Sequence, residues 1–561
     1  MLLSHFLQLT GVRVNCCRRD MAIIPEKLVT KGLLPENLPP VYSAQNIWSA
    51  FSLDGTTYAV TAKMVGEPCV YNASKRGGQR RLFDIPHPTF VRDQGLFFEK
   101  HWTHIEALFE AAIGSLSRPT VDSQGARHVH VTSHQELPRL RLKRLSRFRF
   151  CLVTDVSRFF PSVYTHTLSW AINGKSAAKT DTQPNSAAVF GNRLDCIIRQ
   201  AQSRQTIGIP VRPDASKIVA EILMSAVDKR FLELSGKSAP AYVRHVDDYW
   251  VGGHTHEECE KHLQNLRLAL KEYQLDINEA KTRIISTKYV FGESWPSEFE
   301  SELQACLGSD GQLYGLDPVS TFGKIVDRAT RDNDDGIIKH VLRVMDDRKL
   351  WSLHWDVIEH FLVQCAVQFP HSFDYVARVI AWRLRTNLQI DKSLWVEIAR
   401  LTALQASRLG RDSETAWAMW LIKELKQKIT IELSDAILDS CGGLVLCFLA
   451  HFPKHNLATD KKLYERMRGA IEGNPFAGAF WPLTLELCHL NEADVAWSKG
   501  TTPKALRALH DAKVSMINWN APPRVFVEVS SGDGGGGPDY AIEDYGQEYG
   551  ERNGKTGDFE F

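Results

Sequence analysis

The chain has 561 residues, enough for several domains of about 150 residues each. Its 43% apolar and 24% charged residues are ordinary for a globular protein and exclude a collagen-like, largely disordered or disulfide-framework chain. Basic and acidic residues number 67 and 66, so the formal net charge is only +1. Residues 531–561 hold eight acidic and two basic residues, so this tail carries −6 and the rest of the chain +7. A nucleic-acid partner is therefore compatible with the near-neutral total.

Cysteine usage and hydropathy indicate a cytoplasmic protein outside the membrane. The 11 cysteines form no CxxC motif, which is typical of reduced thiols. No apolar run reaches the length of about 18 residues that predicts a membrane span. The apolar start is not preceded by a basic region, so we interpret residues 1–20 as an upstream extension before Met21, not as a signal peptide.

The pattern along the chain predicts an α+β half followed by an all-α half that resembles helical repeats. Residues 1–44 comprise the extension and a proline-rich arm, which we expect to be extended. Strand and helix signals mix over 45–150 and alternate over 151–297. Over 298–520 apolar residues recur at spacings of three and four, which predicts helices. Residues 521–561 contain a Gly-rich linker and the acidic tail, which we expect to be disordered.

A basic run precedes the second segment. Residues 139–149 are rich in Lys and Arg, and Phe148 interleaves with the end of the run. Such a run is more often a solvated face, but it also suits binding to a phosphate backbone. The candidates for nucleic-acid contact are Arg141, Lys143, Arg144 and Arg147.

Three carboxylates form the strongest chemical signal. Asp247 and Asp248 lie between two apolar β-prone runs in YVRHVDDYWVG (242–252), which predicts a hairpin with the acids at its turn. Asp155 ends the apolar run FCLVTD (150–155). Adjacent buried carboxylates are costly unless a cation binds there. The cluster is what two-metal nucleotidyl transfer requires, with Mg²⁺ or Mn²⁺ as the expected ion.

Four motifs in chain order resemble those of the palm domain of reverse transcriptases. Asp155 with Phe160 is similar to polymerase motif A, and QTIGIP (205–210) is similar to motif B. His245-Val-Asp247-Asp248 is similar to the YxDD box of motif C, with His in place of Tyr. The run LDINEAKT (275–282) is similar to motif D.

The resemblance implies a fold and an activity. Residues 45–150 would be the fingers, 151–297 the palm, and 298–520 a helical domain that replaces the thumb. Asp155, Asp247 and Asp248 would be catalytic and would hold the metal, and Lys281 would neutralise or protonate the leaving pyrophosphate. Phe160 would be a steric gate against the ribose 2′-hydroxyl. The implied nucleotide-binding residues are Arg80, Arg81, Arg158, Phe160, Gln205 and Gly208.

Two longer runs narrow the resemblance. Residues 157–175 and 191–222 look like the bacterial abortive-infection and defence-associated reverse transcriptases of the AbiK-like group. This implies an RNA-directed DNA polymerase-like enzyme of anti-phage defence that uses dNTPs, makes single-stranded DNA without a template and forms a homo-oligomer. Two alternatives remain: a reverse transcriptase templated by a dedicated non-coding RNA, and a catalytically silent nucleic-acid-binding scaffold.

Protein priming needs a hydroxyl group on a mobile or cleft-facing segment. The acidic tail offers such groups beyond its Gly-rich hinge, and the proline-rich arm offers Tyr42 and Ser43. The candidate priming residues are Tyr540, Tyr545, Tyr549 and Tyr42.

Overall fold

The computed structural model describes residues 23–51, 57–122, 124–134, 136–236, 239–289, 299–301, 303, 317–471, 476–493 and 503–526. Within the proline-rich arm it corrects the expectation of an extended segment. Residues Pro25–Thr30 form a short helix, α2, with Pro25 at its first position. Proline suits that position, because its φ is already helical and its missing N–H would have no partner in the helix. The arm continues through a short 3₁₀ turn, η1 (Trp48–Ala50).

The strands form three antiparallel sheets. β1 (Cys69–Ser74) pairs with β2 (Arg80–Ile85), and β3 (Thr120–Val121) pairs with β4 (Val129–His130). The largest sheet has the order β6-β7-β5-β8. Its strands are β5 (Phe150–Asp155), β6 (Tyr242–His245), β7 (Asp248–Gly253) and β8 (Arg283–Ser286).

The helices of the α+β half are α3 (Pro88–Ala111), α4 (Leu137–Leu145), α5 (Phe159–Ser162), α6 (His166–Asn173), α7 (Lys175–Thr180), α8 (Gly191–Ala201), α9 (Asp214–Ser235) and α10 (His256–Glu272), followed by the 3₁₀ turns η3 (Glu279–Lys281) and η4 (Thr287–Tyr289). Among these helices, α4 and α10 pack on the four-stranded sheet and α9 is joined to it by a hydrogen bond.

Strand alternation divides the four-stranded sheet into two covered faces. Leu137 and Leu145 of α4 pack against Val243 and Trp250 on one face. On the other face Tyr249 reaches α9, and α10 contacts β5 and β7. Successive residues of a strand point to opposite faces, so the neighbours Tyr249 and Trp250 reach different helices. Because each face is covered by different helices, the face on which a residue at a strand end lies can be read from the strand register.

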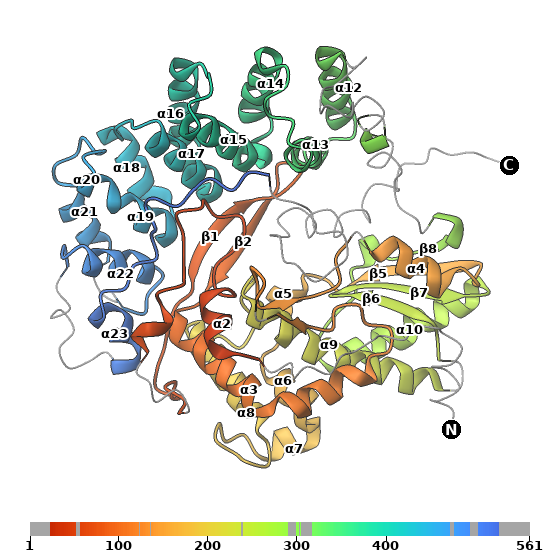
Figure 1. Cartoon of the computed structure of the whole chain (residues 1–561). Coiled ribbons are helices and arrows are strands. Elements are labelled where there is room, and N and C mark those ends of the chain that lie inside the picture. The colour runs from red at the N-terminus through yellow and green to blue at the C-terminus, as the bar shows by residue number, and fades with distance from the viewer. Residues whose placement is uncertain are drawn as a thin grey trace.

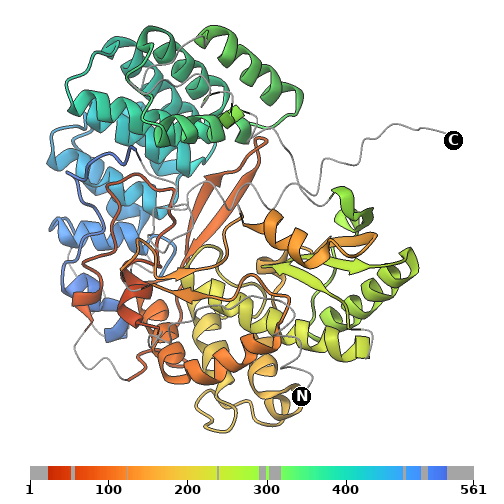
Figure 2. The same cartoon turned by 45° about the vertical axis from the view of Figure 1, so that its right-hand side comes forward.

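The second half is helical, as the spacing of its apolar residues predicts. No strand occurs in the described residues between 317 and 526. In Figure 1 these helices form an arc beside β1 and β2, and Figure 2 shows the β1–β2 hairpin running between the arc and the rest of the molecule. They are α12 (Pro318–Arg331), α13 (Gly336–Asp347), α14 (Trp355–Gln368), η5 (Pro370–Ser372), α15 (Phe373–Arg385), α16 (Lys392–Arg408), α17 (Asp412–Glu424), α18 (Ile431–Ser440), α19 (Gly443–Leu449), α20 (His451–Lys454), α21 (Leu463–Ala470), α22 (Trp481–His489) and α23 (Lys504–Asp511).

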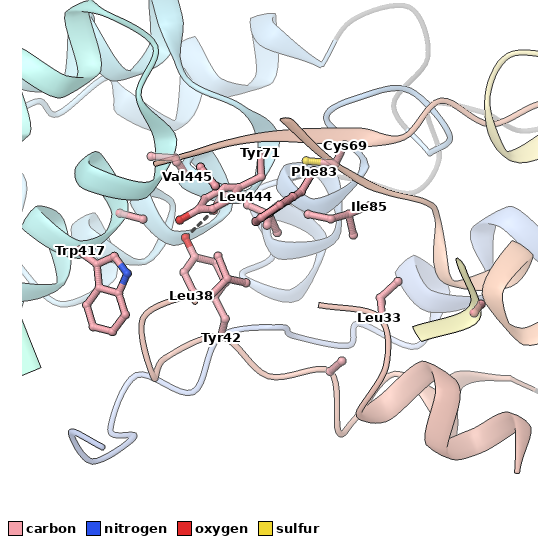
Figure 3. Close-up of a cluster of buried hydrophobic side chains, with 14 of the residues drawn as sticks. Leu33, Leu38, Tyr42, Cys69, Tyr71, Phe83, Ile85, Trp417, Leu444 and Val445 are labelled. Atoms are coloured by element: carbon pink, nitrogen blue, oxygen red, sulfur yellow. Dashed lines mark hydrogen bonds between the residues drawn. The ribbon is translucent and has the colours of Figure 1, made fainter. Parts of the chain in front are cut away.

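One hydrophobic core joins the two halves. A single cluster of buried residues extends from Ile23 to Met516. Figure 3 shows part of it, where Tyr42 of the arm and Phe83 of β2 lie near Leu444 of α19. The Tyr42 hydroxyl donates to the Leu444 carbonyl at 2.8 Å. The backbone N–H of the next residue along the arm bonds the Met516 carbonyl at 2.8 Å, so the start and end of the described chain hold each other. No helix of the described ranges is long and apolar enough to cross a bilayer.

Replacing Tyr42 tests whether the halves unfold together. Tyr42→Phe removes one buried hydrogen bond between the arm and α19, so we expect the free energy of unfolding to fall by about 1 kcal/mol. Urea titration followed by far-UV circular dichroism and by tryptophan fluorescence should give one shared transition for the variant and the wild type. Two separated transitions would show that the helical half is an independent folding unit.

Candidate active site

Two of the three acids lie side by side at one end of the largest sheet. Asp155 is the last residue of β5 and Asp248 is the first of β7, and the strand register pairs them directly. Directly paired residues in adjacent antiparallel strands point to the same face. That face is the one covered further along by α4, because Val153 pairs with Trp250 two residues on.

The third acid lies in the turn of the hairpin. β6 pairs with β7 so that His245 faces Asp248, which leaves Val246 and Asp247 as the two turn residues. The carbonyl of Asp247 accepts the backbone N–H of Val156 at 3.2 Å, so the turn is attached to the strand that carries Asp155. The hairpin expected from the apolar runs therefore forms, with one acid in the turn and one at the start of the second strand.

His245, in place of the tyrosine of the YxDD box, is engaged by the segment before α4. Its ring nitrogen Nε2 lies 2.9 Å from the Thr132 carbonyl oxygen. The ring also lies 4.3 Å from that of His134. Since His245 and Asp248 face each other on the same side of the hairpin, this segment borders the acids.

Burial, and after it mutual repulsion, shapes the electrostatics of the acids. Burial, followed by the charge of Asp155, raises the pKa of Asp247 to about 6. Burial, followed by Asp247 and Asp155, raises the pKa of Asp248 well above its usual value. The cluster thus holds more negative charge than its surroundings neutralise, which is typical of a site that binds cations.

Cationic side chains from three separate segments counter part of this charge. Lys281 Nζ, in η3, lies 3.3 Å from Asp155 Oδ2. Arg81 of β2 and Lys281 both lower the pKa of Asp247, and Lys281 and Arg141 of α4 lower that of Asp248. The guanidinium of Arg141 also stacks 4.5 Å from the Trp250 ring. The structure therefore brings Asp155, Asp247, Asp248 and Lys281 together.

The acids suit a metal ion that takes only some of its ligands from the protein. Among the residues the structure describes, no three His, Cys, Asp or Glu side chains are arranged to hold an ion by themselves. Mg²⁺ in phosphoryl-transfer sites is held by one or two carboxylates, with waters and substrate phosphates completing its shell. Asp247 Oδ1 is buried and accepts no hydrogen bond from any described residue. Such an oxygen fits a cation completed by substrate.

The segments resembling motifs A and B lie in contact. The N–H groups of Gly208 and Ile209 donate to the carbonyls of Val163 and Phe160 at 2.8 Å and 3.0 Å. Gly208 has φ +90°, a conformation that favours glycine, and a Cβ there would meet the Pro161 carbonyl at 3.4 Å. Phe160 is half-buried beside this contact.

The other nucleotide-binding candidates are not all near the acids. Gln205 and Arg158 are exposed, and Arg158 precedes α5 with φ 45°. Arg80 is held away by the helical half: its guanidinium binds both carboxylate oxygens of Glu414 on α17. Neighbouring strand residues point to opposite sides, so Arg81 points away from Glu414, and its charge lowers the pKa of Asp247.

The basic run divides into inward and outward side chains. Arg141 stacks on Trp250, and Arg144 Nη1 lies 3.5 Å from the Tyr242 carbonyl oxygen, so both cover the sheet. Lys143 and Arg147 are exposed. Of the four candidates, Lys143 and Arg147 are therefore the two placed to meet a phosphate backbone.

Of the candidate priming residues, the structure describes only Tyr42. It is 6% exposed, and burial raises its pKa well above the usual value. A hydroxyl group already bound to the Leu444 carbonyl inside the core is not accessible for priming. Tyr540, Tyr545 and Tyr549 lie outside the described residues.

Sequence reasoning missed the support beneath the hairpin. Arg244 is fully buried and binds Glu221 and Asp228, both on α9. The signal was available: a lone arginine within an apolar strand requires buried acidic partners, and Glu221 and Asp228 are spaced seven apart on one helix face.

Comparisons with known proteins add little to this geometry. No family model matches the chain. No curated protein matches it either. Among solved structures, apo telomerase from Candida Tropicalis is 11% identical to the chain, with a TM-score of 0.30, covering 73% of this chain and 72% of that one. So distant a likeness supports no conclusion about fold or activity.

The repulsion within the cluster gives a test on metal-free protein. With its pKa raised from 3.8 to about 6, the Asp247 carboxylate destabilises the folded state as pH rises through that interval. In EDTA at pH 8, Asp247→Asn should therefore raise the free energy of unfolding by about 1–3 kcal/mol, allowing for partial solvent contact. Below pH 4 the gain should vanish.

The control is Asp276→Asn, which changes an exposed carboxylate beyond the cluster. Its stability should stay within about 0.5 kcal/mol of wild type at both pH values. A less stable Asp247→Asn protein at pH 8 would contradict the repulsive picture, since it would mean that attractive contacts hold the carboxylate.

Proposed function

We propose that this protein is a reverse-transcriptase-type nucleotidyltransferase that joins deoxynucleotides through Asp155, Asp247 and Asp248. The observation that carries the proposal is the convergence of these acids at one end of a four-stranded antiparallel sheet, with Lys281 and Arg81 beside them. The sheet with α9 and α10 corresponds, in this proposal, to a palm, and β1 and β2 to fingers.

Each group has a task in the proposed reaction. A hydroxyl oxygen attacks the α-phosphorus of a dNTP, the hydroxyl proton passes to water, and the bond to pyrophosphate breaks as pyrophosphate leaves. Asp155, Asp247 and Asp248 would supply part of the shell of a bound Mg²⁺ or Mn²⁺, with water and substrate phosphates as the other ligands, and the ion would favour ionisation of the attacking hydroxyl and offset charge on the phosphates. Lys281 neutralises or protonates the leaving pyrophosphate, and Arg81 binds the triphosphate. Phe160 blocks a 2′-hydroxyl, and Gly208 allows the substrate backbone to approach.

The finer parts of the proposal rest on the sequence runs that resemble defence-associated reverse transcriptases. They are anti-phage defence, synthesis without a template, priming by a protein hydroxyl and homo-oligomer formation. For priming, the tail tyrosines Tyr540, Tyr545 and Tyr549 take precedence over Tyr42, whose hydroxyl is buried in the core.

Incubation of purified protein with dNTPs tests the chemistry. Samples receive Mg²⁺ or Mn²⁺ and labelled dNTPs, singly and together, after nuclease treatment, and half are treated with protease afterwards. We expect labelled DNA whose mobility changes on proteolysis. EDTA or the Asp247→Asn/Asp248→Asn variant should lower the yield at least about a thousandfold, because both remove charge stabilisation at the reacting phosphate.

The other outcomes separate the alternatives. Synthesis that starts only after the co-purifying RNA is restored would mean a templated enzyme with a dedicated RNA. Absence of synthesis in every condition, by a protein that still binds nucleic acid, would mean a silent scaffold. Mapping the attached peptide identifies the priming residue, and a DNA adduct at Tyr42 would contradict the burial of its hydroxyl.

Salt dependence tests the outward basic residues. Lys143→Ala/Arg147→Ala should reduce the slope of log Kd against log salt for a single-stranded oligonucleotide by about 1.4, the value for two lost phosphate contacts. Lys461→Ala/Lys462→Ala removes the same charge from exposed positions on the helical half and should leave the slope unchanged. Equal effects of the two variants would show that only net charge matters.

A further inference from the structure

A buried ion network lies directly beneath the turn that carries Asp247. Nε of Arg244 donates to Asp228 Oδ2 at 2.9 Å, and its two terminal nitrogens donate to the two carboxylate oxygens of Glu221 at 2.9 Å each. Arg244, Glu221 and Asp228 are all at most 1% exposed. This planar, three-point attachment leaves the guanidinium with one orientation.

Further hydrogen bonds complete the network. The Tyr249 hydroxyl donates to Asp228 Oδ1 at 2.6 Å, and the Ser115 hydroxyl donates to Glu221 Oε1 at 2.7 Å. Backbone bonds join Arg244 to Gly114 and Leu116 on the outer edge of β6. Each acid is therefore held on more than one side, so Arg244 is a fixed point in the sheet.

From this fixed point Arg244 reaches the turn. Nη1 also donates to the Val246 carbonyl at 3.0 Å. The N–H of Val246 donates to the Ser117 hydroxyl at 2.5 Å. Both backbone polar groups of Val246 are thus held from outside the turn.

Val246 needs this support because its conformation is unfavourable. Its φ is 54°, while Asp247, the other central residue, does not have a positive φ. Two-residue hairpin turns with this pattern favour glycine at the first position, and a β-branched residue there is strained. Such strain persists where the surrounding structure imposes it.

The direction of Asp247 depends on this turn. Its Oδ1 atom is buried and accepts no hydrogen bond within the described part of the chain, so side-chain contacts to that oxygen do not orient it. A hydrogen bond with the backbone of Asp247 itself lowers the pKa of the carboxyl, so the backbone conformation of the turn also governs where the side chain lies.

We propose that Arg244 is a positioning residue that holds Val246 in its left-handed conformation and so directs the Asp247 carboxylate toward Asp155. Ser117 assists from the opposite side of the same peptide unit. The inference deepens the proposed function and rests on it for the chemistry that the carboxylates perform.

The test pairs Arg244→Lys with a rescue at the turn. Lysine keeps the charge between Glu221 and Asp228 but cannot reproduce the guanidinium's fork to Glu221 and Val246. We expect kcat for dNTP addition to fall about ten- to a hundredfold with KM within about threefold, and the Kd for Mn²⁺, measured by electron paramagnetic resonance without nucleotide, to rise about tenfold. Adding Val246→Gly to Arg244→Lys should restore most of both losses, because glycine adopts φ > 0 without support.

Ser225→Ala is the matched control, because Ser225 bonds Glu221 but does not contact the turn. It should change kcat and Mn²⁺ affinity by less than about twofold. If Arg244→Lys does not fold, as judged by circular dichroism, Ser117→Ala with and without Val246→Gly makes the same comparison without disturbing the buried charges.

The outcomes separate this inference from the proposed function. Losses that Val246→Gly leaves unchanged would overturn the positioning role and leave Arg244 a purely structural residue. If the wild type binds Mn²⁺ but adds no nucleotide, the proposed function fails, and the Mn²⁺ measurements still decide the role of Arg244. A wild type that does neither overturns both.

Discussion

The site depends on one constraint: three carboxylates that repel one another lie at one end of a small sheet. Strand pairing places Asp155 beside Asp248, and the hairpin turn adds Asp247. Sequence distance does not predict what surrounds them: Lys281 comes from a 3₁₀ turn after α10, and Arg81 from a hairpin near the start of the described chain. The positive charges that partly neutralise the acids therefore reach them only when these separate segments have folded together.

The two faces of the sheet solve this problem differently. On the face of the acids, α4 covers the far end, its Arg141 stacks on Trp250 and lowers the pKa of Asp248, and Asp247 and Asp248 are only partly buried. On the opposite face Arg244, Glu221 and Asp228 are sealed from water, and each of the three guanidinium nitrogens donates to one of the two acids. The acids on the first face leave negative charge that a cation can offset. The buried network on the second face holds the strand and the turn in place.

The parts of the site within one strand or hairpin could be predicted from the sequence. The apolar runs around Asp155 and Asp247 determine strand ends, and strand ends determine where the acids lie. Which of Arg80 and Arg81 lies near the acids could not be predicted, because strand alternation puts them on opposite sides without showing what lies on each side. The burial of Tyr42 depends on α19, 402 residues away along the chain. A proline-rich segment gives no indication of such a partner in the sequence, so the prediction for this segment is an extended arm.

The adjacency of Arg80 and Arg81 has a mechanical consequence. Arg80 is attached to Glu414 on the helical half, and the next residue along the same strand faces the acids. A strand of this length moves as a unit, so a shift of α17 relative to the large sheet also displaces Arg81. A molecule that binds the helical half and shifts α17 would then change the affinity of the site for a ligand that Arg81 binds. By thermodynamic linkage, that ligand would change the affinity of the helical half for the molecule by the same factor. A ligand that moved α17 would in this way act on Arg81 through β2.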